Sequence, residues 1–170
     1  LIVSLNGAFL PFEGLAAAVF SPLAKVLASS SLLPHVFARY GGDPASVHRL
    51  IGGTGSVLDA EGERLYGRLV SDPAHVAAAM QMMANWDLHP LVRDLPRLRC
   101  VLLLIAASND RSVPPDVARR VRKLVARSSL DIIPRYGHLI HEEAPPLIAK
   151  RIVDAAAAGA ILPVQVGSSN

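Results

Sequence analysis

The sequence predicts an α/β protein in which parallel strands alternate with helices that cover the sheet. Short apolar runs bounded by turn residues occur at 1–5, 100–107 and 130–133, and such runs are typical of buried parallel strands. A helical pattern follows the second run and another follows the third, giving the order strand, helix, strand, helix. Of the 170 residues, 51% are apolar and 18% are charged, which favours one globular domain over a disordered chain.

The chain divides into four stretches of different character. Residues 1–10 hold a core strand and the loop after it, which starts at a turn-forming Asn-Gly pair. Residues 11–98 contain helix starts and chain breakers but no convincing strand, so we expect a mainly helical insertion over the sheet. Residues 99–160 carry the strand, helix, strand, helix order, and residues 161–170 form a tail.

Helix starts inside the expected insertion are marked by aspartates. Asp43, Asp59 and Asp72 each precede a helical run, where an aspartate side chain can accept a hydrogen bond from the first-turn N–H groups. Pro44 and Pro73 occupy the first helical position, where a missing N–H costs nothing. These signals predict several short helices.

The run "VPPDVARRVRKLVARSS" at 113–129 predicts an amphipathic helix, with its valines on one face and its basic residues on the other. The formal charge is +3, and the basic residues gather at 119–123, which on a helix is normally a solvated face. Aromatic residues are not interleaved with them and no nucleic-acid reader motif is present, so we expect no nucleic-acid partner.

A single cysteine, Cys100, excludes an internal disulfide and fits a reducing compartment; at the start of an apolar strand it is expected to be a core residue. The longest apolar stretches, 101–107 and 155–164, are shorter than the roughly 18–20 residues of a spanning helix. The first residues lack a methionine and a basic region, so they indicate a strand of a longer protein rather than a signal peptide. We expect a cytoplasmic protein without a transmembrane segment.

Polar residues follow two of the predicted strands. Asp110 lies just beyond 101–106, and Gly137-His138 lies just beyond 130–133. Ligands and catalytic groups collect at the carboxyl ends of parallel strands, so the carboxylate is expected within hydrogen-bond reach of the imidazole. There it would fix the tautomer and stabilise the protonated ring. An aspartate after a strand is more often a turn former or helix cap, and a lone histidine is usually structural, so both interpretations stay open here.

Two further groups of side chains could bind something. His141, Glu142 and Glu143 resemble metal ligands, but consecutive residues at a helix start rarely converge, and we expect no metal and no cofactor. A methionine and aromatic stripe could line a porphyrin pocket, although such stripes more often belong to the core. Its members are Met80, Met82, Met83, Trp86 and His89.

The segments "NDRSVPP" at 109–115 and "IPRYGHLIHEEAPP" at 133–146 resemble the acid and histidine positions of the α/β-hydrolase superfamily. The segments "LNGAFLPFEG" at 5–14 and "MMANWDLHPLVRDLPRL" at 82–98 are similar to one branch of it, the magnesium-chelatase accessory proteins of bacteriochlorophyll biosynthesis. The likeness spans residues 1 to about 156. It implies that the chain is the C-terminal part of the fold, with a helical cap insertion at 11–98.

The resemblance also implies roles for individual residues. Asp110 would be the acid of a catalytic triad and His138 its base. Asn6 and Gly7, on the loop after the first strand, would line the substrate pocket together with Met83 and Trp86. One small departure is Ala107, where the family often has glycine.

A larger departure is that no G-x-S-x-G nucleophile motif occurs in these residues, although the triad order places it before the acid and the histidine. Ser4, Ser56 and Ser108 do not lie on a strand-to-helix elbow. Three hypotheses follow. In the first, the chain is part of a serine-triad ester or amide hydrolase, which would be inactive without its nucleophile half. Alternatives are a non-catalytic accessory protein that binds a tetrapyrrole or magnesium chelatase, and a structural piece that folds only with its missing half.

Overall fold

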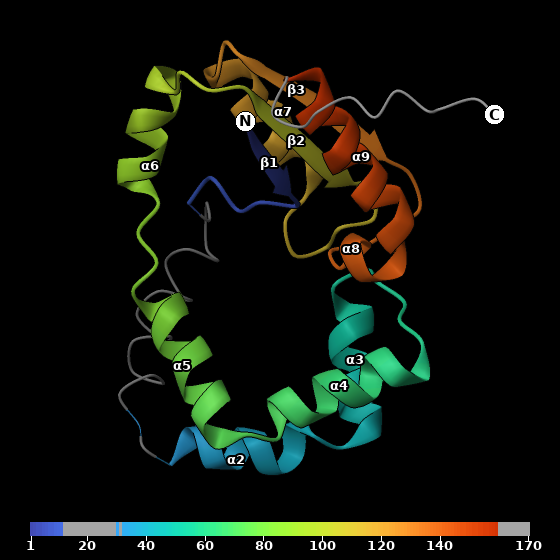
Figure 1. The fold of residues 1–170 in the computed structure, drawn as a ribbon. Coiled ribbons are helices and arrows are strands. Elements are labelled where there is room, and N and C mark those ends of the chain that lie inside the picture. Colours follow the sequence, from blue (N-terminus) through green and yellow to red (C-terminus); the bar gives the residue numbers. More distant parts are fainter. Residues whose placement is uncertain (12–29, 31, 160–170) are drawn as a thin grey trace, which may run out of the picture.

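The computed structural model describes residues 1–11, 30 and 32–159 and confirms an α/β fold with a parallel sheet (Figure 1). The strands are β1 (Ile2–Leu5), β2 (Leu102–Ala107) and β3 (Ser128–Ile133), all parallel and in the order β1-β2-β3. Ile2 is in register with Leu102, and Leu102 with Ser128. The carboxyl ends of the strands therefore meet at one edge of the sheet.

Two boundaries differ from the sequence prediction. The second strand begins at Leu102, so Cys100 precedes it and is half-buried instead of being a core residue. The third strand begins two residues earlier than its apolar run, at Ser128. The earlier start follows from pairing with β2, because Ser128 is in register with Leu102 and Ser129 with Leu103.

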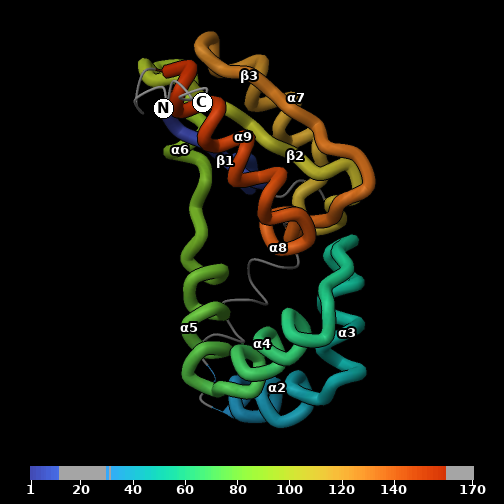
Figure 2. The backbone as a smooth tube through the Cα atoms, turned by 45° about the vertical axis from the view of Figure 1, so that its right-hand side comes forward, coloured from blue at the N-terminus to red at the C-terminus, as the bar shows by residue number. Residues whose placement is uncertain are grey.

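The sheet packs on both faces, because successive residues of a strand point to opposite sides. Leu102 and Leu104 of β2 pack with Val121 of α7 (Pro115–Leu124). Ile105 and Ala107 instead belong to a second cluster, which includes residues of the two C-terminal helices α8 (Ile140–Glu143) and α9 (Pro145–Ala158). Figures 1 and 2 show α7 and α9 on opposite sides of the strands. β2 is therefore the centre of the core.

The described residues of the expected insertion form helices and no strand, and residues 33–97 are called the helical segment here. Residues 12–29 and 31 of the expected insertion, and the whole of the expected tail at 161–170, lie outside the described residues. The elements of the helical segment are α2 (Leu33–Gly41), α3 (Pro44–Gly53), α4 (Ala60–Val70), α5 (Pro73–Ala84), α6 (His89–Asp94) and a 3-10 turn, η1 (Leu95–Arg97).

The three predicted helix caps are confirmed. The carboxylate of Asp43 accepts a hydrogen bond from the Ser46 N–H at the start of α3. Asp59 and Asp72 make the equivalent contacts at the starts of α4 and α5, with the N–H groups of residues 62 and 74. Each cap satisfies a donor that the helix itself leaves without a partner.

Helices α2 to α5 lie beyond the edge where the strands end, and α3 comes close to α8 (Figures 1 and 2). On the other side, α6 and η1 return the chain to the sheet. This placement agrees with a cap over the strand ends, although the division of the chain into core and cap stays a prediction. No helix in the described part of the chain combines the length and the apolar character needed to cross a bilayer.

Candidate active site

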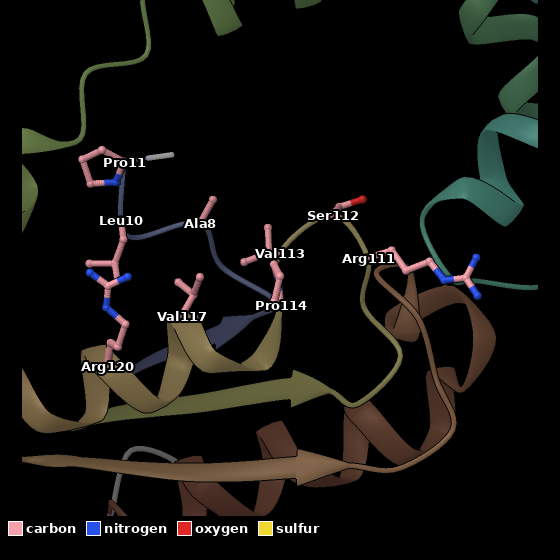
Figure 3. Close-up of a pocket in the computed structure, with 9 residues that line it drawn as sticks. All are labelled: Ala8, Leu10, Pro11, Arg111, Ser112, Val113, Pro114, Val117 and Arg120. Carbon is pink, nitrogen blue, oxygen red and sulfur yellow. The ribbon is translucent and has the colours of Figure 1, made fainter. Parts of the chain in front are cut away.

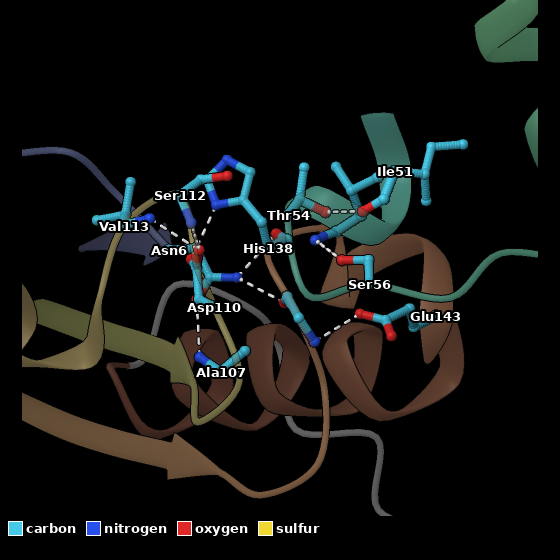
Figure 4. A network of polar contacts seen from close by, with 12 residues as sticks. Asn6, Ile51, Thr54, Ser56, Ala107, Asp110, Ser112, Val113, His138 and Glu143 are labelled. Atoms are coloured by element: carbon cyan, nitrogen blue, oxygen red, sulfur yellow. Dashed lines mark hydrogen bonds and ion pairs between the residues drawn. The ribbon is translucent and has the colours of Figure 1, made fainter. Parts of the chain in front are cut away.

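The expected contact between acid and imidazole is present at the carboxyl ends of β2 and β3. Asp110 Oδ2 lies 2.8 Å from His138 Nδ1 (Figure 4). Asp110 Oδ1 accepts hydrogen bonds from the N–H groups of Ser112 and Val113, each at 2.8 Å. Asp110 therefore fulfils both interpretations, because one oxygen organises the turn before α7 and the other faces the histidine.

The surroundings of the pair define its proton arrangement. The Asp110 side chain is fully buried, while that of His138 remains 31% exposed. An ionised carboxylate can only accept hydrogen bonds, so this contact favours the neutral tautomer with the proton on His138 Nδ1 and the lone pair on Nε2. The arrangement can therefore take up a proton at Nε2, with the buried carboxylate stabilising the imidazolium that forms.

Asn6 connects the ends of all three strands. Its Oδ1 accepts a hydrogen bond from the Ala107 N–H at 2.7 Å, at the end of β2. Its Nδ2 donates to the carbonyls of His138, at 2.8 Å, and Gly137, at 3.2 Å. Its φ is 47°, in the left-handed region that asparagine tolerates better than most residues. The buried Asn6 amide thus hydrogen-bonds to the backbone of Gly137 and His138. A direct contact of Asn6 with substrate stays a prediction.

A cavity of about 320 Å³ lies beside the acid loop, which we define as residues 108–114 (Figure 3). The other predicted pocket residues, Gly7, Met83 and Trp86, do not line this cavity. Gly7 precedes Ala8 in the chain, and an added Cβ there would lie 2.3 Å from Ser4 Oγ and 2.7 Å from Phe9 Cε2, so those side chains would have to move. The cavity is lined by Ala8, Leu10, Pro11, Arg111, Ser112, Val113, Pro114, Val117 and Arg120.

Met83 and Trp86 belong to the far side of the helical segment, at and just after the end of α5. Their side chains are 52% and 48% exposed, so the stripe does not form a core in the described residues. Figures 1 and 2 place α5 across the helical segment from α3, the helix that approaches the histidine. A role for these two side chains in binding a substrate or a tetrapyrrole stays a prediction.

The two glutamates after His138 accept hydrogen bonds from protein groups and do not converge on a common point. Glu143 accepts hydrogen bonds from the N–H groups of Gly137, at 2.8 Å, and Val57, at 3.1 Å. Glu142 accepts one from the Tyr66 hydroxyl at 2.6 Å. Within the described ranges, no three histidine, cysteine, aspartate or glutamate side chains are grouped to hold a metal ion.

One structural contribution to the site comes from a loop for which no prediction was made from the sequence. The loop between α3 and α4, residues 54–57, which we call the bridging loop, lies against both His138 and Arg111: the Thr54 carbonyl accepts a hydrogen bond from each of their backbone N–H groups. The pattern "GGTGS" at 52–56 was the available signal, because closely spaced glycines mark places where backbones approach each other.

A parallel sheet that places a buried aspartate against a histidine at its carboxyl edge is the arrangement found in α/β hydrolases. The alpha/beta hydrolase family matches residues 3–151, and the chain belongs to this family. The chain is 37% identical over 153 residues to the magnesium-chelatase 30 kDa subunit of Rhodobacter capsulatus, covering 90% of this chain and 54% of that protein. It is 32% identical over 101 residues to the uncharacterized hydrolase YugF of Bacillus subtilis (strain 168), covering 58% of this chain and 36% of that protein.

Solved structures share the fold. An esterase from Thermogutta terrifontis superposes with a TM-score of 0.61 at 20% identity, over 92% of this chain and 55% of that chain. The esterase EaEST from Exiguobacterium antarcticum superposes with a TM-score of 0.57 at 15% identity, over 81% of this chain and 48% of its own. The chain thus spans about half the length of these structures and of its relative from Rhodobacter capsulatus.

Proposed function

We propose that this protein is a hydrolase of the serine-triad class, acting on ester or amide bonds, with His138 as the general base and Asp110 as the acid. The observation that carries the proposal is the 2.8 Å contact between a fully buried carboxylate and a partly exposed imidazole. Nε2 would take the proton of the attacking hydroxyl and later give it to the leaving group. Asp110 would hold the ring in the required tautomer throughout.

The proposed hydrolysis needs a nucleophile that these residues do not supply, and we propose that it comes from an upstream part of the complete protein. No G-x-S-x-G motif occurs in the 170 residues, and in the part of the chain that the structure describes no serine lies on a strand-to-helix elbow. The triad follows the order nucleophile, acid, histidine. The chain also covers only 54% of its relative from Rhodobacter capsulatus. We therefore propose that the helical segment is a cap, that these residues alone are inactive, and that the complete protein is a cytoplasmic enzyme for a small-molecule substrate.

A second candidate function is an accessory role without turnover. It is favoured by the 37% identity to a protein named as a magnesium-chelatase subunit. In this case the hydrolase fold would bind a tetrapyrrole or the chelatase itself. The exposed Met83 and Trp86 side chains would then be available for that contact. A family fold supports both candidates, because one fold carries many functions.

Hydrolysis of p-nitrophenyl acetate tests the first proposal. The 170-residue chain should give no turnover above background, whereas a protein that includes the elbow serine should hydrolyse the ester. His138→Ala should reduce kcat by at least about 10³-fold, because no base remains to accept the serine proton. His141→Ala is the matched control, since this histidine is exposed and its Nε2 lies 3.4 Å from Oε1 of its neighbour Glu142.

Equal activity in the unsubstituted protein and in His138→Ala would exclude His138 as the base. A protein that is inactive despite an intact elbow would instead favour the accessory role. Binding of a tetrapyrrole, followed by its absorbance, would then be the next measurement.

A further inference from the structure

The bridging loop touches the two loops that carry the acid and the histidine, and it does so through one carbonyl group. The Thr54 oxygen accepts hydrogen bonds from the Arg111 N–H at 3.1 Å and from the His138 N–H at 3.3 Å. Arg111 directly follows Asp110 in the chain. This acceptor therefore joins the acid loop to the histidine loop, which we define as residues 134–139. It acts beside direct hydrogen bonds between the two loops, such as that from the Asn109 N–H to the Tyr136 carbonyl at 3.0 Å.

Glycines allow the three backbones to come this close. A Cβ on Gly137 would lie 2.2 Å from the carbonyl carbon of Gly55 and 2.3 Å from the Ser56 nitrogen. A Cβ on Gly55, whose φ is +84°, would lie 2.0 Å from the carbonyl oxygen of Asn109 in the acid loop. Side chains at these positions would push the loops apart, so the backbones of the bridging loop, the acid loop and the histidine loop are in direct contact.

Two side chains hold the bridging loop in this position. Ser56 is 2% exposed, and its Oγ accepts a hydrogen bond from the Leu139 N–H at 2.8 Å, one residue after the histidine. Glu143 joins the two loops from the other side, because its oxygens accept from Val57 N–H and Gly137 N–H. Figure 4 shows Thr54, Ser56 and Glu143 around the backbone of His138.

We propose that the bridging loop positions the imidazole of His138 against Asp110, with Ser56 and Glu143 as its positioning residues. This inference rests on the proposed function and assigns to the helical segment a part in the geometry of the catalytic pair. Without the Ser56 acceptor, the partly buried Leu139 N–H loses its partner, and a shift of the histidine loop would be needed to give it another. A shift of about 1 Å at a catalytic group can cost up to about 100-fold in rate.

The test compares Ser56→Ala with Ser128→Ala in the protein that includes the elbow serine. Ser128 is the matched control, because it is also a buried serine whose hydroxyl bonds a backbone group, but it lies at the opposite end of β3. Ser56→Ala should lower kcat about tenfold with KM unchanged. It should also shift or broaden the proton resonance of His138 Nδ1–H, which the carboxylate contact moves downfield. Ser128→Ala should leave both readouts unchanged.

Glu143→Gln is the second variant. Glutamine has nearly the same shape as glutamate, but an amide donor replaces one of the two acceptor oxygens. It should change kcat and the His138 resonance in the same direction, and it decides the question if Ser56→Ala does not fold. An unchanged His138 resonance and kcat in the folded variants would overturn the inference. If the unsubstituted protein does not hydrolyse esters, the proposed function fails, while the resonance still decides whether the bridging loop positions the ring.

Discussion

The central strand and the helical segment differ in how much apolar surface they remove from water. All residues of β2 are buried except Leu103, which is partly buried. In contrast, α4, α5 and α6 contain no buried residue in the part of the chain that the structure describes. The buried apolar residues of the helical segment lie in α2, α3 and η1. Hydrophobic burial is roughly proportional to the apolar area removed, so β2 is the stable part, and α4, α5 and α6 are the marginal part of the helical segment.

The marginal part nevertheless reaches the catalytic pair. Large apolar side chains of the helical segment remain exposed, and its links to the histidine region are polar contacts. These links are the bridging loop with Glu143 and the hydrogen bond from Tyr66 to Glu142. The comparison teaches that the rigid sheet supplies the acid and the histidine, while a less stable element contacts the loops that carry them. The exposed side chains include Val36, Phe37, Tyr40, Leu50, Val57, Leu65, Leu69, Met82, Met83 and Trp86.

The largest expected effect is the loss of a buried side chain from the sheet. Leu104→Ala should lower the free energy of unfolding by about 2–5 kcal/mol, because Leu104 is 1% exposed and its truncation leaves a cavity. Leu65→Ala in α4 should cost less than about 1 kcal/mol, because Leu65 is 43% exposed. Urea denaturation of both variants measures the difference. Equal losses would mean that the helical segment is as tightly packed as the sheet.

A smaller effect is expected at the junction of the three strand ends. Asn6→Asp keeps the oxygen that accepts from Ala107 N–H but loses the Nδ2 that donates to the carbonyls of Gly137 and His138. The cost should be about 1–3 kcal/mol at neutral pH, because a buried carboxylate would then face two carbonyl oxygens. Asn85→Asp is the control, since the Asn85 Nδ2 also donates to a carbonyl, that of Gln81, but in an exposed position. Equal losses in the two variants would contradict the role given to Asn6.

The smallest effect concerns the link between α4 and α8. Burial, together with the hydrogen bond to Glu142, raises the pKa of Tyr66 well above its usual range. The folded state therefore keeps the phenol proton to a higher pH than the unfolded state does. The contribution of Tyr66 to stability is fully present below the ordinary tyrosine pKa of about 10 and is lost as pH rises from there through the raised value.

Above about pH 10, the unsubstituted protein should thus lose stability more steeply than Tyr66→Phe, which has no proton to lose at this position. Urea denaturation at pH 8 and at about pH 10.5 measures the two slopes. Tyr40→Phe, which removes an exposed phenol from α2, is the control. Parallel slopes for the unsubstituted protein and Tyr66→Phe would show that Tyr66 does not hold α4 against α8.

The sequence predicted the parts of the fold that depend on local patterns. Apolar runs bounded by turns located three strands, and the aspartates at 43, 59 and 72 located three helix starts. The pair of Asp110 and His138 was also predictable, because each residue lies in the loop after a strand and parallel strands end at a common edge. Their catalytic role remains a prediction for the assay of ester hydrolysis.

The contacts that sequence reasoning missed join segments far apart in the chain. Ser56 meets Leu139 across 83 residues, and Asn6 meets His138 across 132 residues. A hydroxyl or an amide has no periodic signature, so nothing local indicates which distant N–H or carbonyl it will find. A local pattern can also mislead. The composition of the stripe with Met83 and Trp86 favoured a core, but the tertiary structure leaves both side chains half exposed.

By itself the sequence determined the strand and helix order and the placement of an acid and a base after successive strands, because these follow from hydrophobic periodicity and from the geometry of parallel sheets. Only the tertiary structure decided how the pair is held. It brought the Thr54 carbonyl to Arg111 and His138, and it used the Asn6 amide beneath the histidine. The physical reason is that a buried N–H or carbonyl must find a partner wherever packing places one, and packing is a property of the whole chain.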